Sequence, residues 1–417
     1  MKRLLLTTIA TLCLATPVVA QQAPPKPTDD QLAAVYKEDQ LNDPKCGVPR
    51  NAGDDYRPTP ATPDQTRAPR VNDKQKFKIE TVASGLKNPW SITFLPDNNM
   101  LVTIRNSGLK IVKPDGTVSD LLPGTPTIKN SIPLFGMHDV VLDKDFKKNR
   151  TFYVVYNTTP EGAKGSVGYI ASAKLPADEK SVTDWKVLKE GAMTPRRLIQ
   201  AKDGTLLVIT ADIITPYVSA QNLASPQGKI IRINTDGSIP KNNPFVNNKD
   251  AEPSVYAVGF RDAQGITFRP GTSELWIVEN EPRGGDELNK VEAGKNYGFP
   301  TISYGRDNNG KMLGEGITAK DGLEQPVYFW TPSIATSGLV FYDGDKLKGW
   351  KGSAFLGGLS GMQLVRLEIN KQGRVTGEEK LLRDQCKRIR DVRQGPDGLL
   401  YVLTDETNGE ILKLSPG

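Results

Sequence analysis

The 417-residue sequence is poor in the side chains that usually bind zinc, since it has one histidine and three cysteines. A closed zinc site needs four ligands, so the single histidine and the two cysteines beyond the N-terminus would need carboxylates to complete the shell. The sequence also lacks the GxSxG phrase of serine hydrolases and any glycine loop that could hold phosphate. These absences argue against a zinc enzyme, a serine hydrolase of that type and a nucleotide-binding loop.

Dense basic clusters and long apolar runs are also missing. The formal net charge is +6, and it falls to +4 without Lys2 and Arg3. No basic run is dense enough to follow a phosphate backbone, so we do not expect nucleic acid as a partner. After the first twenty residues no segment is apolar for long enough to span a bilayer, which argues against membrane insertion.

The N-terminus has the pattern of a secretory signal peptide. Lys2 and Arg3 precede an apolar run, and small residues stand before a cleavage point after Ala20. We therefore predict a signal peptide at residues 1–20 and a periplasmic or secreted protein. In an oxidising compartment the remaining cysteines, Cys46 and Cys386, either form a disulfide or stay as two buried thiols.

Residues 21–75 are rich in Pro, Asp, Lys and Gln and poor in β-branched residues. Such a composition buries little apolar surface, so we predict a largely irregular N-terminal extension. A short helix is expected at about Asp29–Glu38, with Thr28 as its cap. If Cys46 bonds Cys386, the disulfide ties this extension to the last part of the fold.

One phrase recurs six times beyond this extension: an apolar strand, a turn rich in Pro, Asp, Gly and Asn, and a second apolar strand. Asp-Gly and related pairs supply the backbone conformation of tight hairpins. Spacings of roughly 50 to 70 residues leave room for about four strands per copy, as in propeller blades. The sequence predicts an all-β, six-bladed β-propeller, and the copies are ITFLPDNNMLVTI from Ile92, VVLDKDFKKNRTFYVVY from Val140, RLIQAKDGTLLVIT from Arg197, ITFRPGTSELWIVE from Ile266, GLVFYDGDKLKGWKGSAFLGGL from Gly338 and VRQGPDGLLYVLTD from Val392.

The ends of this region predict how the ring closes. The strands KFKIETVA near Phe77 and GEILKLS near Ile411 have no partner in their own neighbourhood. Closing a ring requires such a pair to share one blade, and closure removes exposed strand edges. We therefore predict a propeller domain at residues 76–417.

Four long segments of the chain closely resemble the soluble quinoprotein glucose/sorbosone dehydrogenases, also called aldose sugar dehydrogenases. They occur in the family's order and are GKIIRINTDGSIPKNNPF from Gly228, AVGFRDAQGITF from Ala257, PRGGDELNKVEAGKNYGFPTISYG from Pro282 and RIRDVRQGPDGLLYVLTDETNGEILKL from Arg388. The resemblance covers nearly all of the chain after about Phe77.

The resemblance implies a propeller that binds pyrroloquinoline quinone (PQQ) and Ca²⁺ near its axis, with the sugar above the cofactor. In the family, a histidine base takes the sugar's hydroxyl proton while hydride passes to the quinone. The implied partners are a small-molecule sugar and an unidentified electron acceptor, for a monomer or homodimer.

Three arginines match the family's cofactor-binding positions. Arg388 and Arg390 in RIRDV alternate with Ile389, so both side chains leave one face of a strand. Arg261 in GFRDAQG matches the arginine of the family's GHRNPQG phrase. Guanidinium forks bind carboxylates in a bidentate way, so three converging arginines would suit the three carboxylates of PQQ. The alternative without ligand binding is that Arg388 and Arg390 form a structural ion pair with Asp391.

Two neighbouring positions depart from the family pattern. Asp262 replaces the usual asparagine and brings a negative charge toward an anionic cofactor. The Gly-Pro pair whose carbonyls hold calcium in the family corresponds here to Glu281 and Pro282. A backbone ligand survives substitution if its conformation does, so Ca²⁺ bound by the carbonyls of Glu281 and Pro282 is an expectation.

The catalytic positions depart most. The family's phrase HFGGRLVF corresponds to MTPRRLIQ, which places Met193 at the base histidine, and methionine cannot accept a proton. Leu134 in PLFGMHDV stands at the glutamine of GQGGLLDV, and Ile213 ends the segment that corresponds to GDR or GDQ. Ser360 stands where some members have a lysine.

His138 is the only histidine and is therefore the obvious substitute base, although a lone histidine beside an apolar strand is more often structural. A buried carboxylate with a raised pKa is the other source of a base. For Asp286 and Glu287 the structural interpretation is that both carboxylates accept hydrogen bonds from backbone amides in a turn. The carboxylate candidates are Asp139, Asp212, Asp262, Glu281, Asp286 and Glu287.

Three functions remain open from the sequence. The first is a periplasmic PQQ-dependent sugar dehydrogenase with an atypical base. The second is a propeller that has lost catalysis and binds a sugar or an anion. The third is a calcium-assisted lactonase or hydrolase, since the fold alone does not decide the chemistry.

Overall fold

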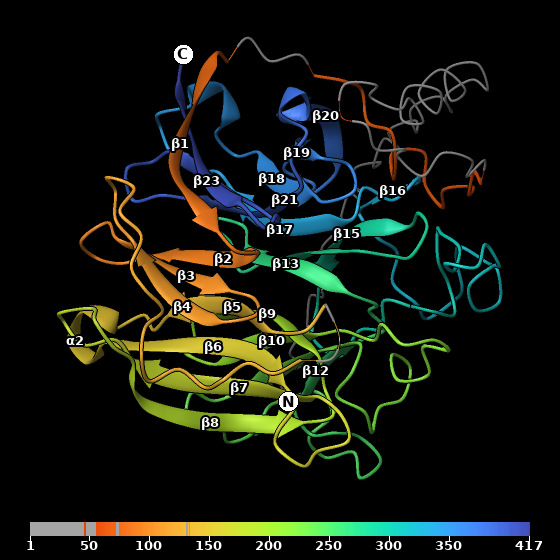
Figure 1. Ribbon diagram of the computed structural model, residues 1–417. Coiled ribbons are helices and arrows are strands. Elements are labelled where there is room, and N and C mark those ends of the chain that lie inside the picture. The colour runs from red at the N-terminus through yellow and green to blue at the C-terminus, as the bar shows by residue number, and fades with distance from the viewer. Residues whose placement is uncertain (1–45, 47–55, 72–74, 131, 133) are drawn as a thin grey trace, which may run out of the picture.

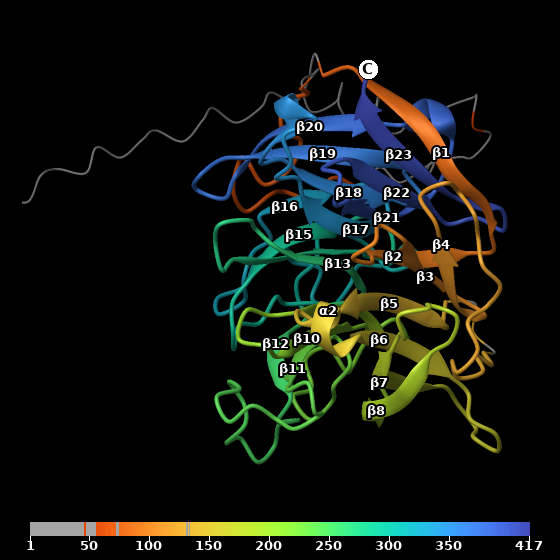
Figure 2. The same cartoon turned by 90° about the vertical axis from the view of Figure 1, so that its left-hand side faces the viewer.

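The computed structural model describes residues 46, 56–71, 75–130, 132 and 134–417. Five four-stranded sheets and one three-stranded sheet pack side by side around one axis (Figures 1 and 2). This confirms the all-β, six-bladed propeller that the repeated phrase predicts. The predicted signal peptide and the predicted helix at Asp29–Glu38 lie outside the described residues.

Each blade begins with an inner strand that contacts the inner strands of both neighbouring blades. The inner strands of blades 1 to 6 are β2 (Pro89–Phe94), β5 (Met137–Leu142), β9 (Pro195–Gln200), β13 (Ala263–Phe268), β17 (Thr336–Phe341) and β21 (Ile389–Gln394). A hairpin joins each to a second strand, as predicted, and these are β3 (Met100–Ile104), β6 (Thr151–Thr158), β10 (Leu206–Thr210), β14 (Leu275–Glu279), β18 (Ala354–Gly358) and β22 (Leu400–Thr404).

The third and fourth strands lie toward the outside. The third strands are β4 (Gly108–Val112), β7 (Val167–Lys174), β11 (Lys229–Ile233), β15 (Asp286–Val291), β19 (Gln363–Ile369) and β23 (Gly409–Pro416). The fourth strands are β8 (Thr183–Gly191), β12 (Val255–Val258), β16 (Tyr328–Trp330), β20 (Val375–Leu381) and β1 (Phe77–Leu86). The helical segments of the described chain are α2 (Phe146–Asn149), η1 (Lys348–Trp350) and η2 (Arg383–Gln385), and none is long and apolar enough to cross a membrane.

The Asp-Gly hairpins form for the reason expected from the sequence. Between β9 and β10, the amide of Gly204 donates to the carbonyl of Ala201, and Gly204 has a φ of 88°. Between β21 and β22, Gly398 makes the same bond to Gly395 with a φ of 75°. Positive φ costs glycine little because it has no Cβ atom, so these turns fix the register of both hairpins.

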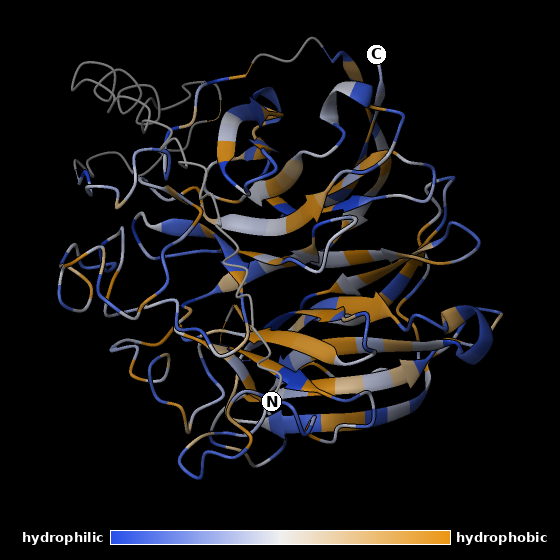
Figure 3. Ribbon diagram, turned by 180° about the vertical axis from the view of Figure 1, so that it is seen from behind, coloured by the Kyte–Doolittle hydropathy of each residue, from blue (hydrophilic) through white to orange (hydrophobic). Residues whose placement is uncertain are grey.

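The hydrophobic core lies between the blades. In the described residues, six apolar clusters each combine side chains of two neighbouring blades, and hydrophobic residues concentrate in the strands (Figure 3). The cluster between blades 5 and 6, for example, packs Trp350 and Phe355 against Ile389 and Val402. Each blade therefore buries both faces of its sheet against neighbours, which makes the ring the unit of stability.

The two ends of the propeller share blade 6, as predicted. Strand β1 pairs antiparallel with β23 from Phe77 opposite Pro416 to Leu86 opposite Gly409, and the two strands lie side by side in Figures 1 and 2. The first strand of the domain is thus the outer edge of the last blade.

An ion-pair network fills the middle of the ring. The Nη1 atom of Arg197 lies 3.3 Å from Asp139 Oδ1 and 3.1 Å from Asp391 Oδ1. Arg393 pairs with the same two carboxylates, both at 2.9 Å. Asp139, Asp391 and Arg197 are at most 1% exposed, and the Arg197 guanidinium lies 4.2 Å from the ring centre of Trp90. Two cations and two anions from β5, β9 and β21 thus join three inner strands at the axis.

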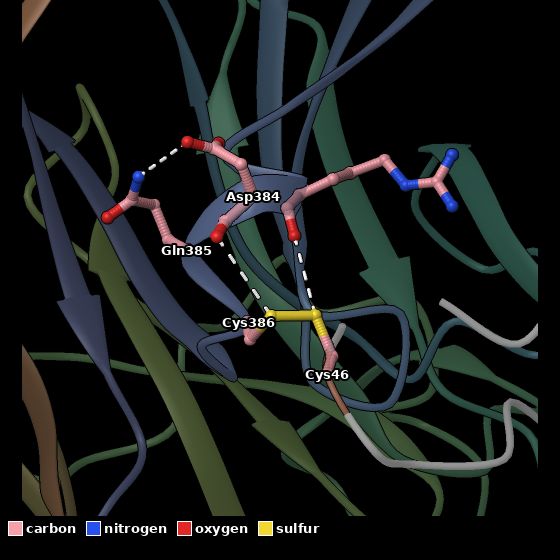
Figure 4. Close-up of a disulfide and its surroundings, with 5 residues drawn as sticks. Cys46, Asp384, Gln385 and Cys386 are labelled. Carbon is pink, nitrogen blue, oxygen red and sulfur yellow. Dashed lines mark hydrogen bonds between the residues drawn. A yellow bond between two sulfur atoms is a disulfide. The ribbon is translucent and has the colours of Figure 1, made fainter. Parts of the chain in front are cut away.

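The described part of the N-terminal extension runs along blades 4 and 5. The hydroxyl of Thr66 donates to the carbonyl of Phe329, and Arg70 forms a parallel bridge with Glu378 of β20. A disulfide joins Cys46 to Cys386, whose Cα atoms are 5.2 Å apart (Figure 4). Residues 56–71 therefore dock on the outer edges of the propeller, and the disulfide links the extension to the loop that leads into β21.

Candidate active site

The polar side chains of interest gather on one face of the ring, which we call the site face. In every blade, the start of the inner strand pairs with the end of the second strand, as in Pro195 with Thr210 and Ile389 with Thr404. Because this pairing repeats six times around the axis, residues beside these strand ends lie near one another although they are far apart in sequence. The site face is formed by these strand ends and the loops that join them to other strands.

Three arginines surround one carboxylate on the site face. Arg390 Nη2 donates to Asp405 Oδ2 at 2.5 Å, Arg388 Nη2 lies 3.7 Å from the same oxygen, and Arg105 Nη1 lies 3.7 Å from Oδ1. Burial alone would raise the pKa of Asp405, but Arg390 and Arg105 outweigh it and hold that pKa below its ordinary value. Arg388 and Arg390 thus converge, and the structural alternative with Asp391 was wrong, because Asp391 pairs with Arg197 and Arg393.

Two buried nitrogen atoms of this group have no partner in the described structure. The Nε atoms of Arg105 and Arg390 are buried without a hydrogen bond. The side chain of Arg388 is 41% exposed, whereas those of Arg105 and Arg390 are 14% and 5% exposed. The group therefore contains two guanidinium donors without acceptors and more positive than negative charge.

Arg261 and Asp262 form the next part of the site face. Arg196 Nε donates to Asp262 Oδ1 at 2.8 Å, and Gln264 Nε2 donates to Asp262 Oδ2 at 2.8 Å. The charge of Asp262 is therefore balanced by Arg196 rather than left facing an anion. Arg261 Nη1 donates to the carbonyl of Asn280 at 2.9 Å, and its buried Nε atom has no partner.

His138 is fully buried at the start of β5, with its ring 4.8 Å from that of Trp90. Its Nδ1 lies 2.7 Å from the carbonyl oxygen of Pro195, and its Nε2 lies 3.2 Å from that of Leu134. The shorter contact, and the Arg196 donor beside Nε2, favour the tautomer with its proton on Nδ1. The lone pair then resides on Nε2, which faces Arg196 Nη1 at 3.3 Å. Burial, and then the charge of Arg196, lower the pKa of His138 well below its ordinary value. As placed, the ring is neutral and its basic nitrogen is covered by Arg196.

The positions at which we expect departures from the family pattern are also on the site face but differ in exposure. Met193 is 3% exposed and packs with Leu198 and Val208 in the cluster between blades 2 and 3. Leu134 is 52% exposed, and its carbonyl accepts a hydrogen bond from Arg196 Nη1 at 2.7 Å. Ser360 donates to the carbonyl of Ser333 at 3.3 Å.

Blade 4 carries a group of buried carboxyls near Arg261. Glu279 and Glu287 stand opposite each other across β14 and β15, share a hydrogen bond, and both accept from Asn289 Nδ2. Burial raises the pKa of Glu279 to about 7. Burial, and then repulsion from Glu279, raise the pKa of Glu281 and Glu287 well above their ordinary values. At least one proton is therefore held in this group at neutral pH.

The remaining carboxylates are bound locally. Asp286 accepts hydrogen bonds from the backbone amides of Glu281, Ile334 and Thr336, as its structural interpretation predicted. Glu287 departs from that interpretation because its partners are side chains. Asp212 accepts from the amides of Ser219 and Ala220.

No group of three or more His, Cys, Asp or Glu side chains suited to a metal ion occurs in the described residues. The hydroxyl of Ser303 donates to Glu281 Oε2, so this carboxyl already has a partner. The calcium site expected at the backbone carbonyls of Glu281 and Pro282 stays a prediction.

Three important residues were not singled out from the sequence. Arg105 and Asp405 directly follow the second strands of blades 1 and 6, and Arg196 is the second residue of β9. Each is a charged residue close to one end of a strand, which was the available signal. Their convergence appears only when the ring brings the six strand ends together.

The comparisons with known proteins agree with this fold. A model of the glucose / sorbosone dehydrogenase family matches residues 86–413. The chain therefore belongs to this family of sugar dehydrogenases. Aldose sugar dehydrogenase YliI from Escherichia coli is 36% identical over 351 residues, which cover 81% of this chain and 92% of that protein.

Solved structures share the fold of this chain. The apo form of the soluble aldose sugar dehydrogenase from Escherichia coli matches with a TM-score of 0.78 and 34% identity, over 82% of this chain and 100% of that one. The PQQ-bound aldose sugar dehydrogenase from Streptomyces coelicolor shares the fold, with a TM-score of 0.64 and 22% identity over 82% of this chain and 99% of that one.

Proposed function

We propose that this protein is an exported, PQQ-dependent sugar dehydrogenase with an atypical catalytic base. The observation that carries the proposal is the group of three guanidiniums around Asp405, whose unpaired Nε atoms and excess positive charge suit a polycarboxylate. PQQ has three carboxylates, so this donor set fits the cofactor. Two of the similar proteins named above support the proposal, since one is an aldose sugar dehydrogenase and the other, which shares the fold, is PQQ-bound.

In this proposal Arg388 and Arg390 bind the cofactor's carboxylates, and Arg261 adds positive charge from blade 4. PQQ supplies a quinone that accepts two electrons as hydride when it is bound. Arg196 and Asp262 form an ion pair with a distance of 2.8 Å and no net charge. Asp262 therefore does not offset the positive charge that these arginines offer to the cofactor. Calcium would be held through the backbone carbonyls of Glu281 and Pro282. An unidentified acceptor would then take the electrons.

His138 is the proposed base, and its surroundings set a condition on that role. Its Nε2 atom can accept a hydroxyl proton only when Arg196 Nη1, now 3.3 Å away, no longer donates to it. A substrate hydroxyl would also need to reach a side chain that is fully buried. Turnover therefore requires a movement of Arg196.

This condition also favours a second candidate function, a propeller that binds an anion or a sugar without turnover. The covered nitrogen of His138 and the buried Met193 are the observations that support it. Both candidates use the same arginines, so they differ in turnover rather than in binding.

The experiment adds PQQ and Ca²⁺ to the purified mature protein and measures both stability and dye reduction on a panel of aldoses. Ligand at a hundredfold excess over its dissociation constant should raise stability by about 2.7 kcal/mol. Stabilisation with dye reduction that the H138Q variant abolishes supports the dehydrogenase and its base. Stabilisation without dye reduction supports the binding module. If the protein shows no stabilisation and no dye reduction, PQQ is removed from the assignment.

A further inference from the structure

The arginine group around Asp405 carries more positive charge than its internal partner can balance. Elsewhere on the axis the charges match, because Arg197 and Arg393 share Asp139 and Asp391. At the site face, three guanidiniums share a single carboxylate. A structural ion-pair network has no need of such an excess, since burying unpaired charge is costly.

Arg105 is the member of this group that the sequence did not indicate, and its backbone is firmly placed. Its amide donates to the carbonyl of Asn88, and its carbonyl accepts from the amide of Met137. A Cβ atom on Gly136 would lie 2.1 Å from the Arg105 carbonyl oxygen, so the two segments are in close contact. Arg105 thus projects from a fixed position in blade 1 toward Asp405 in blade 6.

The positive charges of this group also repel one another. Burial lowers the pKa of Arg105, Asp405 raises it, and the nearby charges of Arg390, Arg196 and Arg388 lower it further. The Nε atoms of Arg105 and Arg390 remain without acceptors. An anion placed beside these guanidiniums would therefore relieve their mutual repulsion.

We propose that Arg105 is a further anion-binding residue, which completes a three-arginine clamp with Arg388 and Arg390 for a rigid polycarboxylate. Asp405 is the internal counter-ion that holds the clamp together and competes with the ligand's carboxylates. The inference rests on the proposed function in one respect, since PQQ is the polycarboxylate named there. The clamp itself follows from the charges and unpaired donors.

Opposite effects of two substitutions test this arrangement. R105A removes a charged donor, so it should weaken PQQ binding about tenfold or more, and R105K should restore part of the loss because it keeps the charge. D405N removes the competing negative charge, so it should tighten binding about threefold or more. R150A is the matched control, because Arg150 is also a partly buried arginine, paired with Glu179 at 3.3 Å in another part of the propeller.

The measurement is calorimetric titration of the full mature protein with PQQ, and separately with citrate, after circular dichroism has shown that each variant is folded. Weaker binding by R105A, tighter binding by D405N and unchanged binding by R150A support the clamp. R105A binding as tightly as the wild type, or D405N binding as weakly as R105A, would overturn it. If citrate shows this pattern and PQQ does not bind, the clamp stands and the PQQ assignment fails.

Discussion

Replacing Arg197 by alanine should be one of the most destabilising single substitutions in this protein. Arg197 belongs to the axial group of two guanidiniums and two carboxylates, and its side chain is 1% exposed. Its Nε atom also donates to the carbonyl of Gln264 at 2.7 Å, and its Nη2 atom donates to that of Arg390 at 3.1 Å. No single neighbour could take over these contacts.

The expected magnitude follows from the charges that remain. R197A leaves two buried carboxylates, Asp139 and Asp391, with Arg393 as their one guanidinium partner in the group. Breaking a buried ion pair by removing one partner costs about 3–5 kcal/mol. With an unfolding entropy of about 2.1 cal/mol/K per residue, this loss corresponds to a fall of roughly 4–7 °C in Tm for a domain of this size.

Urea denaturation and scanning calorimetry would measure the loss. The matched control is K174A, because Lys174 pairs with Asp184 at 3.0 Å while both side chains are at least half exposed. Such a surface pair contributes less than about 1 kcal/mol. In a double-mutant cycle, R197M with D139N should lose less than the sum of the single variants, since one charge of each sign is removed. If R197A lost no more stability than K174A, the axial network would not be a stabilising element.

Burial raises the pKa of Glu279 from 4.5 to about 7, so its contribution to stability is present below pH 4.5 and is lost as the pH rises toward 7. E279Q should flatten that part of the stability curve in urea titrations, and an unchanged slope would contradict the assignment. C386S should lower stability by about 2–4 kcal/mol and make the melting temperature insensitive to reductant; a variant that melts like the wild type would refute this. The buried Tyr328 hydroxyl donates to Glu378 at 2.7 Å, so Y328F should cost about 1–3 kcal/mol in the same urea assay. Tyr401 pairs with an exposed carboxylate, and Y401F is the control that should change little.

Most of the fold could be predicted because its signals are local. Each hairpin is encoded within 13 to 22 residues by two apolar strands and a turn, and Gly204 and Gly398 adopt the positive φ that such turns require. The pairing of β1 with β23 in one blade could be predicted because neither strand has a partner nearby in the sequence. These inferences need no knowledge of side-chain contacts across the ring.

The site was harder to predict because its charges balance across blades. Asp262 looked unfavourable for an anion in the sequence, yet its charge is matched by Arg196 from another blade. Arg105 and Asp405 are 300 positions apart in the chain, and they meet only because blade 6 closes against blade 1. The role of His138 depended in the same way on Arg196, which covers its basic nitrogen.

The pairing of β1 with β23 makes the order of synthesis matter. The ribosome delivers β1 near the beginning of the domain, but the strand's partner emerges only after more than three hundred further residues. Until then β1 presents an unpaired edge, so we expect a nascent or truncated chain without β23 to need a chaperone or to aggregate. A vector that deletes even the last eight or nine codons should therefore yield insoluble protein, although every residue of the site face would still be encoded.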